Sequence, residues 1–200
     1  MRKGTLIALI SVGVIILLAA IMIFSGVSKY NKLVSLEENV NEKWSQVENV
    51  YQRRADLIPN LVNTVKGYAE HEQQTLTKVI EARSKATSVD VDPNNLNPQA
   101  LQKFQQAQNG LSSALSRLMV VVERYPDLKA SQNFRDLQAQ LEGTENRIAV
   151  ERRKFNQAAR KYNTAIRKFP TNLIANSMGF EKKAYFEADQ GAEEAPEVNF

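Results

Sequence analysis

The sequence predicts an all-α protein, in which an N-terminal transmembrane helix continues into the long, kinked first helix of an antiparallel, up-and-down four-helix bundle. Three observations indicate this fold. Residues 5–24 form an uninterrupted apolar run. Apolar residues beyond this run recur at the three- and four-residue spacing of one helix face. The stretches that interrupt the spacing are few and contain Pro, Asn and Asp.

The apolar run predicts a membrane anchor over residues 1–28. Residues 4–28 carry no charge, and the 20 residues of 5–24 match the roughly 20 that cross about 30 Å of hydrocarbon. A cleaved signal peptide is the alternative, because residues 26–28 would suit a cleavage site. The run is longer than the roughly 7 to 15 apolar residues of such signals, which favours a permanent anchor.

Basic residues flank the predicted span on both sides. Arg2 and Lys3 precede it, and Lys29 and Lys32 follow it. Because a first helix usually acts as a signal anchor, positive-inside reasoning favours a cytoplasmic N-terminus. We therefore expect a single-pass protein of the bacterial inner (cytoplasmic) membrane with a periplasmic body.

The body, residues 29–186, begins with a predicted helix over residues 30–86 that contains Pro59. The apolar stripe keeps its phase across the proline, and residues 57–60 contain no Gly that could reverse the chain. The repeat changes there from about 3.67 to about 3.5 residues, the period of a left-handed coiled coil. We therefore expect one kinked helix rather than two helices joined by a loop.

Three further helices complete the predicted bundle. A loop rich in Asp, Asn and Pro covers residues 87–99 and lacks the Gly and Glu of a calcium-binding loop. Asn97 and Pro98 are an N-cap and first-turn pair for the next helix. The predicted helices are residues 98–124, 128–169 and a shorter piece over 171–186, which Gly179 could break.

Charge is distributed unevenly along the chain. The net charge is +4, yet residues 187–200 contain five acids and no base. We expect this acidic tail to be disordered.

Eight basic residues lie within residues 147–168, but the aromatic residues among them, Phe155 and Tyr162, lie seven positions apart on the apolar stripe. This spacing favours core packing over base stacking, so nucleic acid is not an expected partner.

The sequence offers little catalytic chemistry. It has no cysteine and a single histidine, His71, so disulfides, thiolate catalysis, Cys-ligated zinc and an H-E-x-x-H site are excluded. A Gly-rich phosphate loop, a G-x-S-x-G motif and a paired-carboxylate arrangement are also missing. We therefore expect a protein that is not an enzyme and that uses no cofactor.

Polar residues gather instead around Pro59 and midway along the 128–169 helix. In an antiparallel bundle, Arg53, Arg54 and Asp56 could form charge-assisted bonds with Glu145, Arg147 or Glu151 that fix the helix register. The predicted structural signature is Arg53, Arg54, Asp56, Pro59, Asn60, Glu145 and Arg147.

These residues also carry a family resemblance. The sequence resembles the LemA family in four blocks, which are residues 53–72, residues 123–130, residues 141–148, and Phe169-Pro170 with Gly179-Phe180. The resemblance covers about residues 27–187 and leaves the acidic tail outside. It implies a bacterial membrane protein with one N-terminal span and an antiparallel helical bundle, and it supplies no catalytic residues.

The preferred hypothesis is a membrane-anchored scaffold or interaction protein of the bacterial envelope that associates with itself. Its motivation is an apolar seam over residues 33–50 that either the third helix or a second copy must cover. One alternative is a lipid-binding or membrane-shaping protein, in which residues 172–186 with Lys182 and Lys183 return to the bilayer. Another is an accessory subunit of a membrane enzyme or transporter. The expected partners are the lipid bilayer, a second copy and other membrane proteins.

Overall fold

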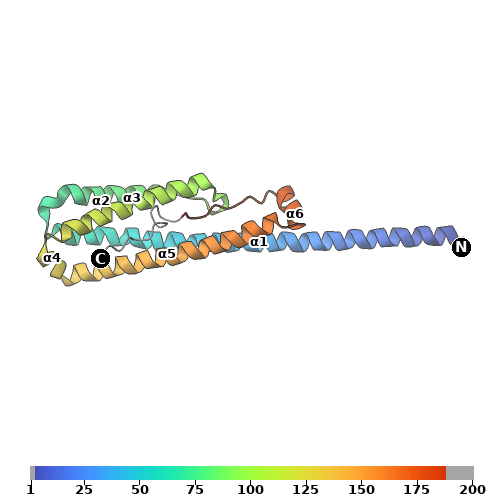
Figure 1. Ribbon diagram of the computed structural model, residues 1–200, viewed down its shortest axis with the longest axis horizontal. Helices are drawn as coiled ribbons and strands as arrows, with labels where there is room; N and C mark the ends of the chain where they lie inside the picture. Colours follow the sequence, from blue (N-terminus) through green and yellow to red (C-terminus); the bar gives the residue numbers. More distant parts are fainter. Residues whose placement is uncertain (1–2, 188–200) are drawn as a thin grey trace, which may run out of the picture.

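The computed structural model describes residues 3–187, and all regular structure within this range is helical (Figure 1). The all-α prediction is confirmed. In chain order the elements are α1 (Lys3–Lys66), the 3-10 helix η1 (Glu70–Glu72), α2 (Gln73–Ser88), the 3-10 helix η2 (Pro93–Asn95), α3 (Pro98–Val122), α4 (Pro126–Ala130), α5 (Gln132–Arg167) and α6 (Thr171–Met178).

Helix α1 has 64 residues and contains Pro59 without a break. At 1.5 Å per residue it is about 96 Å long, and its N-terminal part projects beyond the other helices (Figure 1). Within the described residues it is the one helix long and apolar enough to cross a membrane. The predicted continuity from the span into the body is confirmed, while the kink at Pro59 stays a prediction.

The predicted single helix over residues 30–86 is wrong at its far end, because the chain turns back after Lys66. The amides of Tyr68 and Ala69 both donate to the Val65 carbonyl, at 3.0 and 2.9 Å, before η1 leads into α2. Glu72, a charged residue at a helical-stripe position between Ala69 and Leu76, lies at this end of the bundle. It accepts from Arg124 Nη2 at 2.8 Å and from the Tyr125 hydroxyl at 3.2 Å. Burying a carboxylate is costly unless it is hydrated or paired with a cation. Glu72 is therefore better accommodated at the end of a helix than in its middle.

The four long helices α1, α2, α3 and α5 alternate in direction along the molecule, in the up-and-down order that the sequence predicts (Figure 1). Helix α1 packs against both α5 and α2, and α3 packs against α2. Asn97 caps α3 as expected, since its side-chain oxygen accepts from the Ala100 amide at 2.8 Å and Pro98 follows it.

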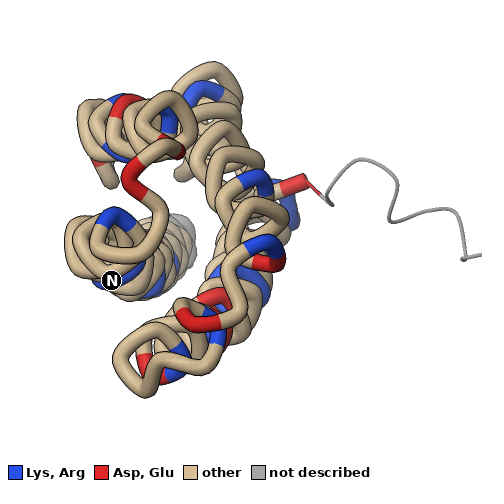
Figure 2. The backbone as a smooth tube through the Cα atoms, turned by 90° about the vertical axis from the view of Figure 1, so that its left-hand side faces the viewer, with Lys and Arg blue, Asp and Glu red and all other residues tan. Residues whose placement is uncertain are grey.

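The buried apolar residues form two clusters along the helices. The cluster nearer the anchor includes Leu33, Trp44 and Tyr51 of α1, and the far cluster begins at Ile58. Phe155 and Tyr162 are fully buried, which confirms that they belong to the core. Figure 2 shows acidic and basic residues interspersed over the helices rather than collected on one face.

The C-terminal part of the body breaks at Gly179, the residue that the sequence offered as a helix breaker. Helix α6 ends at Met178, and Gly179 caps it with a left-handed φ of 77° that glycine adopts without strain. The predicted helical piece over residues 171–186 is therefore helical only over 171–178. Residues 181–187 then follow an irregular path over the bundle, and we call them the strap. The strap buries Phe186, whose ring stacks on Trp44 at 6.0 Å and meets Phe155 edge-on at 5.5 Å.

Two asparagines of α5 bind the backbone of the strap. Asn163 accepts from the Lys183 amide at 2.9 Å and donates to the Lys183 carbonyl at 2.8 Å. Asn156 makes the same pair of bonds with Phe186, at 2.9 and 3.0 Å. The strap and α5 therefore cover the apolar seam over residues 33–50, so this seam is not a vacant surface for a second copy.

The packing of Phe186 makes the strap part of the core, and this can be tested. We expect Phe186→Ala to lower the free energy of unfolding by about 3–5 kcal/mol, because it removes a buried aromatic ring and leaves a cavity beside Trp44. Denaturation of the full chain in detergent, followed by the fluorescence of its one tryptophan, measures the change. Val120→Ala is the control, since Val120 is 71% exposed and its loss should change the stability by less than about 0.5 kcal/mol. Equal losses for the two variants would contradict a structural strap.

Candidate functional site

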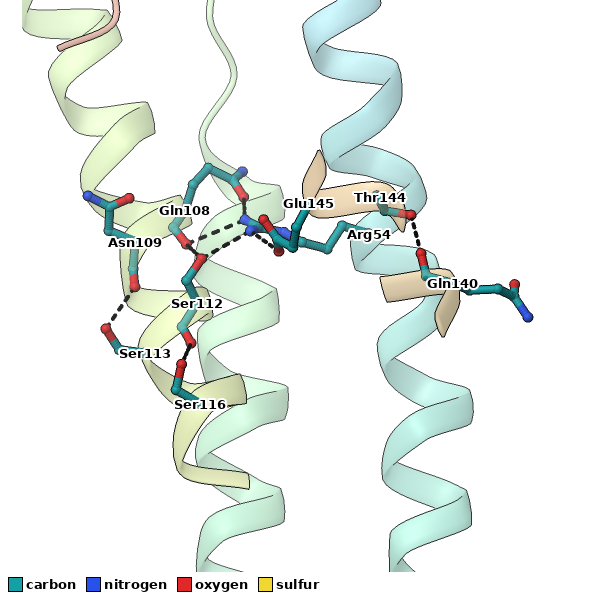
Figure 3. A network of polar contacts seen from close by, with 9 residues as sticks. All are labelled: Arg54, Gln108, Asn109, Ser112, Ser113, Ser116, Gln140, Thr144 and Glu145. Atoms are coloured by element: carbon teal, nitrogen blue, oxygen red, sulfur yellow. Dashed lines mark hydrogen bonds and ion pairs between the residues drawn. The ribbon is translucent and has the colours of Figure 1, made fainter. Parts of the chain in front are cut away.

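A buried arginine lies between the two apolar clusters. Arg54 of α1 is only 1% exposed, and its guanidinium group reaches toward α3 and α5 (Figure 3). Its Nη1 donates to Glu145 Oε1 at 2.7 Å and to Ser112 Oγ at 3.0 Å. Its Nη2 donates to Gln108 Oε1 at 2.6 Å. One side chain thus connects three of the four long helices.

The fourth long helix is connected through Gln108. The side-chain amide of Gln108 donates to the carbonyl of Ala86, close to the end of α2, at 3.1 Å. Gln108 is buried, so both ends of its amide find partners within the bundle. A single polar network therefore fixes the relative register of α1, α2, α3 and α5.

The charge of Arg54 is compensated by several groups at once. A buried cation is strongly unfavourable unless it is paired and hydrogen-bonded, and the planar fork of arginine can meet several acceptors together. The Tyr51 ring adds a cation–π contact, with the Arg54 Cζ atom 5.0 Å from the ring centroid. The Glu145 side chain is about half exposed, so it keeps part of its hydration while it neutralises the arginine.

A second contact across the bundle compensates for Pro59. Proline has no backbone N–H, so the carbonyl of Ala55, four residues earlier, cannot receive its usual helical hydrogen bond. Arg83 of α2 supplies the missing donor, with its Nε 2.7 Å from the Ala55 oxygen. The proline is tolerated inside α1 because a neighbouring helix satisfies the carbonyl that it leaves free.

The structure brings together only two residues of the predicted signature by side-chain contact, Arg54 and Glu145. The remaining members are Arg53, Asp56, Pro59, Asn60 and Arg147, and all five are exposed. Asp56 accepts from its own helix neighbour Gln52 at 2.8 Å instead of from α5.

Sequence reasoning missed three contributors to this region, Gln108, Ser112 and Arg83. Gln108 and Ser112 follow Phe104 and precede Leu115 on one face of α3, so polar residues at these apolar-stripe positions were a usable signal. Nothing in the local sequence pairs Arg83 with Ala55, which lies 28 residues earlier.

A groove of about 350 Å³ opens beside the arginine network, between α3 and α5. Its lining is polar but contains no histidine, and the described residues hold no cluster of metal-ligating side chains. Its residues are Tyr51, Arg54, Gln108, Asn109, Ser112, Ser113, Glu145, Ile148 and Arg152. This arrangement is suited to fixing helices and has no nucleophile–base pair.

A second charge pair, with a buried lysine, lies nearer the anchor. Lys183 of the strap meets Glu37 of α1, with its Nζ 2.8 Å from the carboxylate oxygen, and Tyr162 lies beside them. Burial, and then the charge of Glu37, raise the pKa of the Tyr162 hydroxyl above its ordinary value. The hydroxyl therefore stays protonated and can donate toward Glu37. This pair removes Lys183 from the residues that the lipid-binding alternative had placed at the bilayer.

The arginine network predicts a sharp difference between two neighbouring arginines. We expect Arg54→Ala to lower the free energy of unfolding by about 3 kcal/mol, because the carboxylate of Glu145 and the buried amide of Gln108 lose their cation. Arg53→Ala is the matched control, and since Arg53 is exposed its change should stay within about 0.5 kcal/mol. Denaturation followed by Trp44 fluorescence compares them, and similar losses would argue against a structural role for the buried arginine.

The contact between Arg83 and the Ala55 carbonyl predicts coupling between Pro59 and Arg83. In the native chain, Arg83→Met should lower the free energy of unfolding by about 1–3 kcal/mol, because it leaves a buried carbonyl without a donor. In a Pro59→Ala background the restored backbone N–H can bond to the same carbonyl, so Arg83→Met should then cost about 0.5 kcal/mol or less. A double-mutant cycle measures the difference. Additive losses would show that Arg83 does not compensate for the proline.

Comparison with known proteins finds similarity over most of the chain. The LemA family model matches residues 43–200, so the match extends through the acidic tail, which the sequence resemblance had left out. Magnetosome protein MamQ 2 of Paramagnetospirillum magneticum is 28% identical over 204 residues, covering 92% of this chain and 74% of the relative. Magnetosome protein MamQ of Magnetospirillum gryphiswaldense is also 28% identical, covering 93% of this chain and 74% of the relative.

A third relative carries the family name itself. Protein LemA of Metamycoplasma hominis is 27% identical over 175 residues, covering 88% of this chain and 76% of the relative. None of the three names states an enzyme activity. Because the family model matches well over half of the chain, the protein belongs to the LemA family.

Proposed function

We propose that this protein is a membrane-anchored scaffold of the bacterial envelope, which holds an interaction surface at a fixed distance from the inner (cytoplasmic) membrane. The observation that carries the proposal is the continuity of α1, which runs from the apolar segment to the far end of the bundle in one helix. From Phe24 to Lys66 the helix rises about 63 Å. An unbroken helix transmits position and orientation between its two ends, which a flexible linker does not.

Several features support a structural role over a catalytic one. The most buried charged residue, Arg54, and the buried Gln108 are used to lock the helices together. Two of the relatives are named as magnetosome proteins, and their names refer to no reaction. We place the body on the periplasmic side, because the basic residues before the span favour a cytoplasmic N-terminus.

Self-association is part of the proposal, but the surface for it differs from the one that the sequence suggested. The seam over residues 33–50 is covered within the chain itself. A second copy would therefore meet the anchor helix or the outer faces of the bundle. The apolar side chains of the span, such as Ile15, Met22 and Phe24, are exposed to their surroundings and are available to lipid or to another span.

The distance between the membrane and the far end of the body tests the scaffold. The chain has no cysteine, so Tyr68→Cys places a single dye at the exposed turn between α1 and η1. With acceptor dyes on the lipid headgroups, we expect little energy transfer, because the turn lies about 60 Å from the bilayer if the helix stands upright. A variant with a Gly/Ser insertion after Ser28 is the control, and its transfer should rise as the body loses its fixed orientation.

Strong transfer in the uninterrupted chain would mean that the body lies along the membrane and would refute the scaffold geometry. Native-mass measurement of the detergent-extracted chain tests self-association separately. If the protein has the mass of a single copy at every concentration, self-association is refuted, while the anchored scaffold is unaffected.

A further inference from the structure

Helix α6 lies at the level where α1 leaves the predicted membrane span. Phe180, just after α6, packs edge-on against Tyr30 of α1, with 5.7 Å between the ring centroids. Tyr30 follows the last residue of the span, Phe24, by six positions, which is a rise of about 9 Å along the helix. Figure 1 shows α6 at the end of the body that faces the projecting part of α1.

This end of the body exposes large apolar side chains. Phe169, which precedes α6, is 80% exposed, Leu173 is 60% exposed and Met178 is 63% exposed. We call residues 169–180 the α6 corner. Elsewhere on α2, α3 and α5, exposed apolar residues such as Ile80, Val120 and Val150 occur singly and far apart in the chain. Scattered exposed apolar residues are ordinary, whereas a group at one end of a molecule marks an interaction site.

Several basic residues lie close to the α6 corner in the chain or at its level on α1. The exposed or partly exposed bases nearest to it in the chain and along α1 are Lys29, Lys32, Arg167, Lys168 and Lys182. The acids nearest to them are Glu181 and, farther along α1, Glu38, while Glu37 is already paired with Lys183. Apolar side chains flanked by lysine and arginine fit the surface of a membrane that contains anionic lipids.

We propose that the α6 corner is a second bilayer contact, in which Phe169, Leu173 and Met178 enter the interface of the membrane that α1 spans. The inference rests on the anchoring of α1 in the proposed function, because the anchor places the corner at this height. The bilayer is a better occupant than a second copy, since two identical basic surfaces would repel each other. The continuous helix fixes the body relative to the span, and the contact would in addition set the tilt of both relative to the membrane.

The test uses environment-sensitive labels on the full chain in lipid vesicles. Leu173→Cys is labelled with the fluorophore NBD in vesicles that contain phosphatidylglycerol, and spin-labelled lipids are added as quenchers. Val120→Cys is the matched control, because Val120 is 71% exposed but lies on α3 at the far part of the body. Phe24→Cys reports whether the anchor itself is inserted.

We expect several-fold stronger quenching at Leu173 than at Val120, with strong quenching at Phe24. Quenching at Phe24 with none at Leu173 would overturn the proposal and leave the anchored scaffold intact. Absence of quenching at all three positions would overturn both the bilayer contact of the α6 corner and the membrane-anchored scaffold. If the emission of the label at Leu173 shifts to the blue without quenching, and the shift grows with protein density in the vesicles, the corner contacts another copy. That result would also overturn the proposed bilayer contact. Replacing phosphatidylglycerol with neutral phosphatidylcholine should reduce the quenching at Leu173, and an equal signal would refute the role of the basic residues.

Discussion

The guanidinium group of Arg54 is the constraint on which the arrangement of the helices depends. A cation that is 1% exposed must find acceptors in fixed directions, and here they come from Gln108, Ser112 and Glu145 on two other helices. Apolar clusters on either side of it could pack in several registers, because methyl groups contact one another without strong directional preference. The arginine allows one register, since a shift by one helical turn would separate it from all three partners. This gives specificity more than stability.

The long helix α1 depends on compensation from its neighbours in the same way. Pro59 would ordinarily end or bend a helix, because it removes one hydrogen bond. Arg83 of α2 donates to the freed carbonyl of Ala55, so α1 continues to the far end of the body. The arginine network and this contact lie within two turns of each other on α1. Together they make the middle of the bundle the point where all four long helices are held.

The end of the body nearest the membrane is organised by different means. The strap follows no regular secondary structure, so its backbone groups need partners from outside, and Asn156 and Asn163 supply them. Phe186 closes the aromatic cluster around Trp44. The strap thus takes the place that a second copy could have filled. What remains exposed at this end is the α6 corner, whose apolar residues lie beside the anchor rather than on the flank of the bundle.

The sequence by itself determined the features that depend on neighbouring residues: the apolar span, the helical class, the cap at Asn97 and the core positions of Phe155 and Tyr162. Helical periodicity and capping are local, so they can be recognised from a single chain. Only the tertiary structure decided the turn after Lys66, the partners of Arg54 and the path of the strap. The apolar stripe continues through that turn without losing its phase, and the contacts of Arg54 join residues 54 and 91 positions apart. Local patterns do not specify which distant side chain will satisfy a buried charge or an unpaired carbonyl.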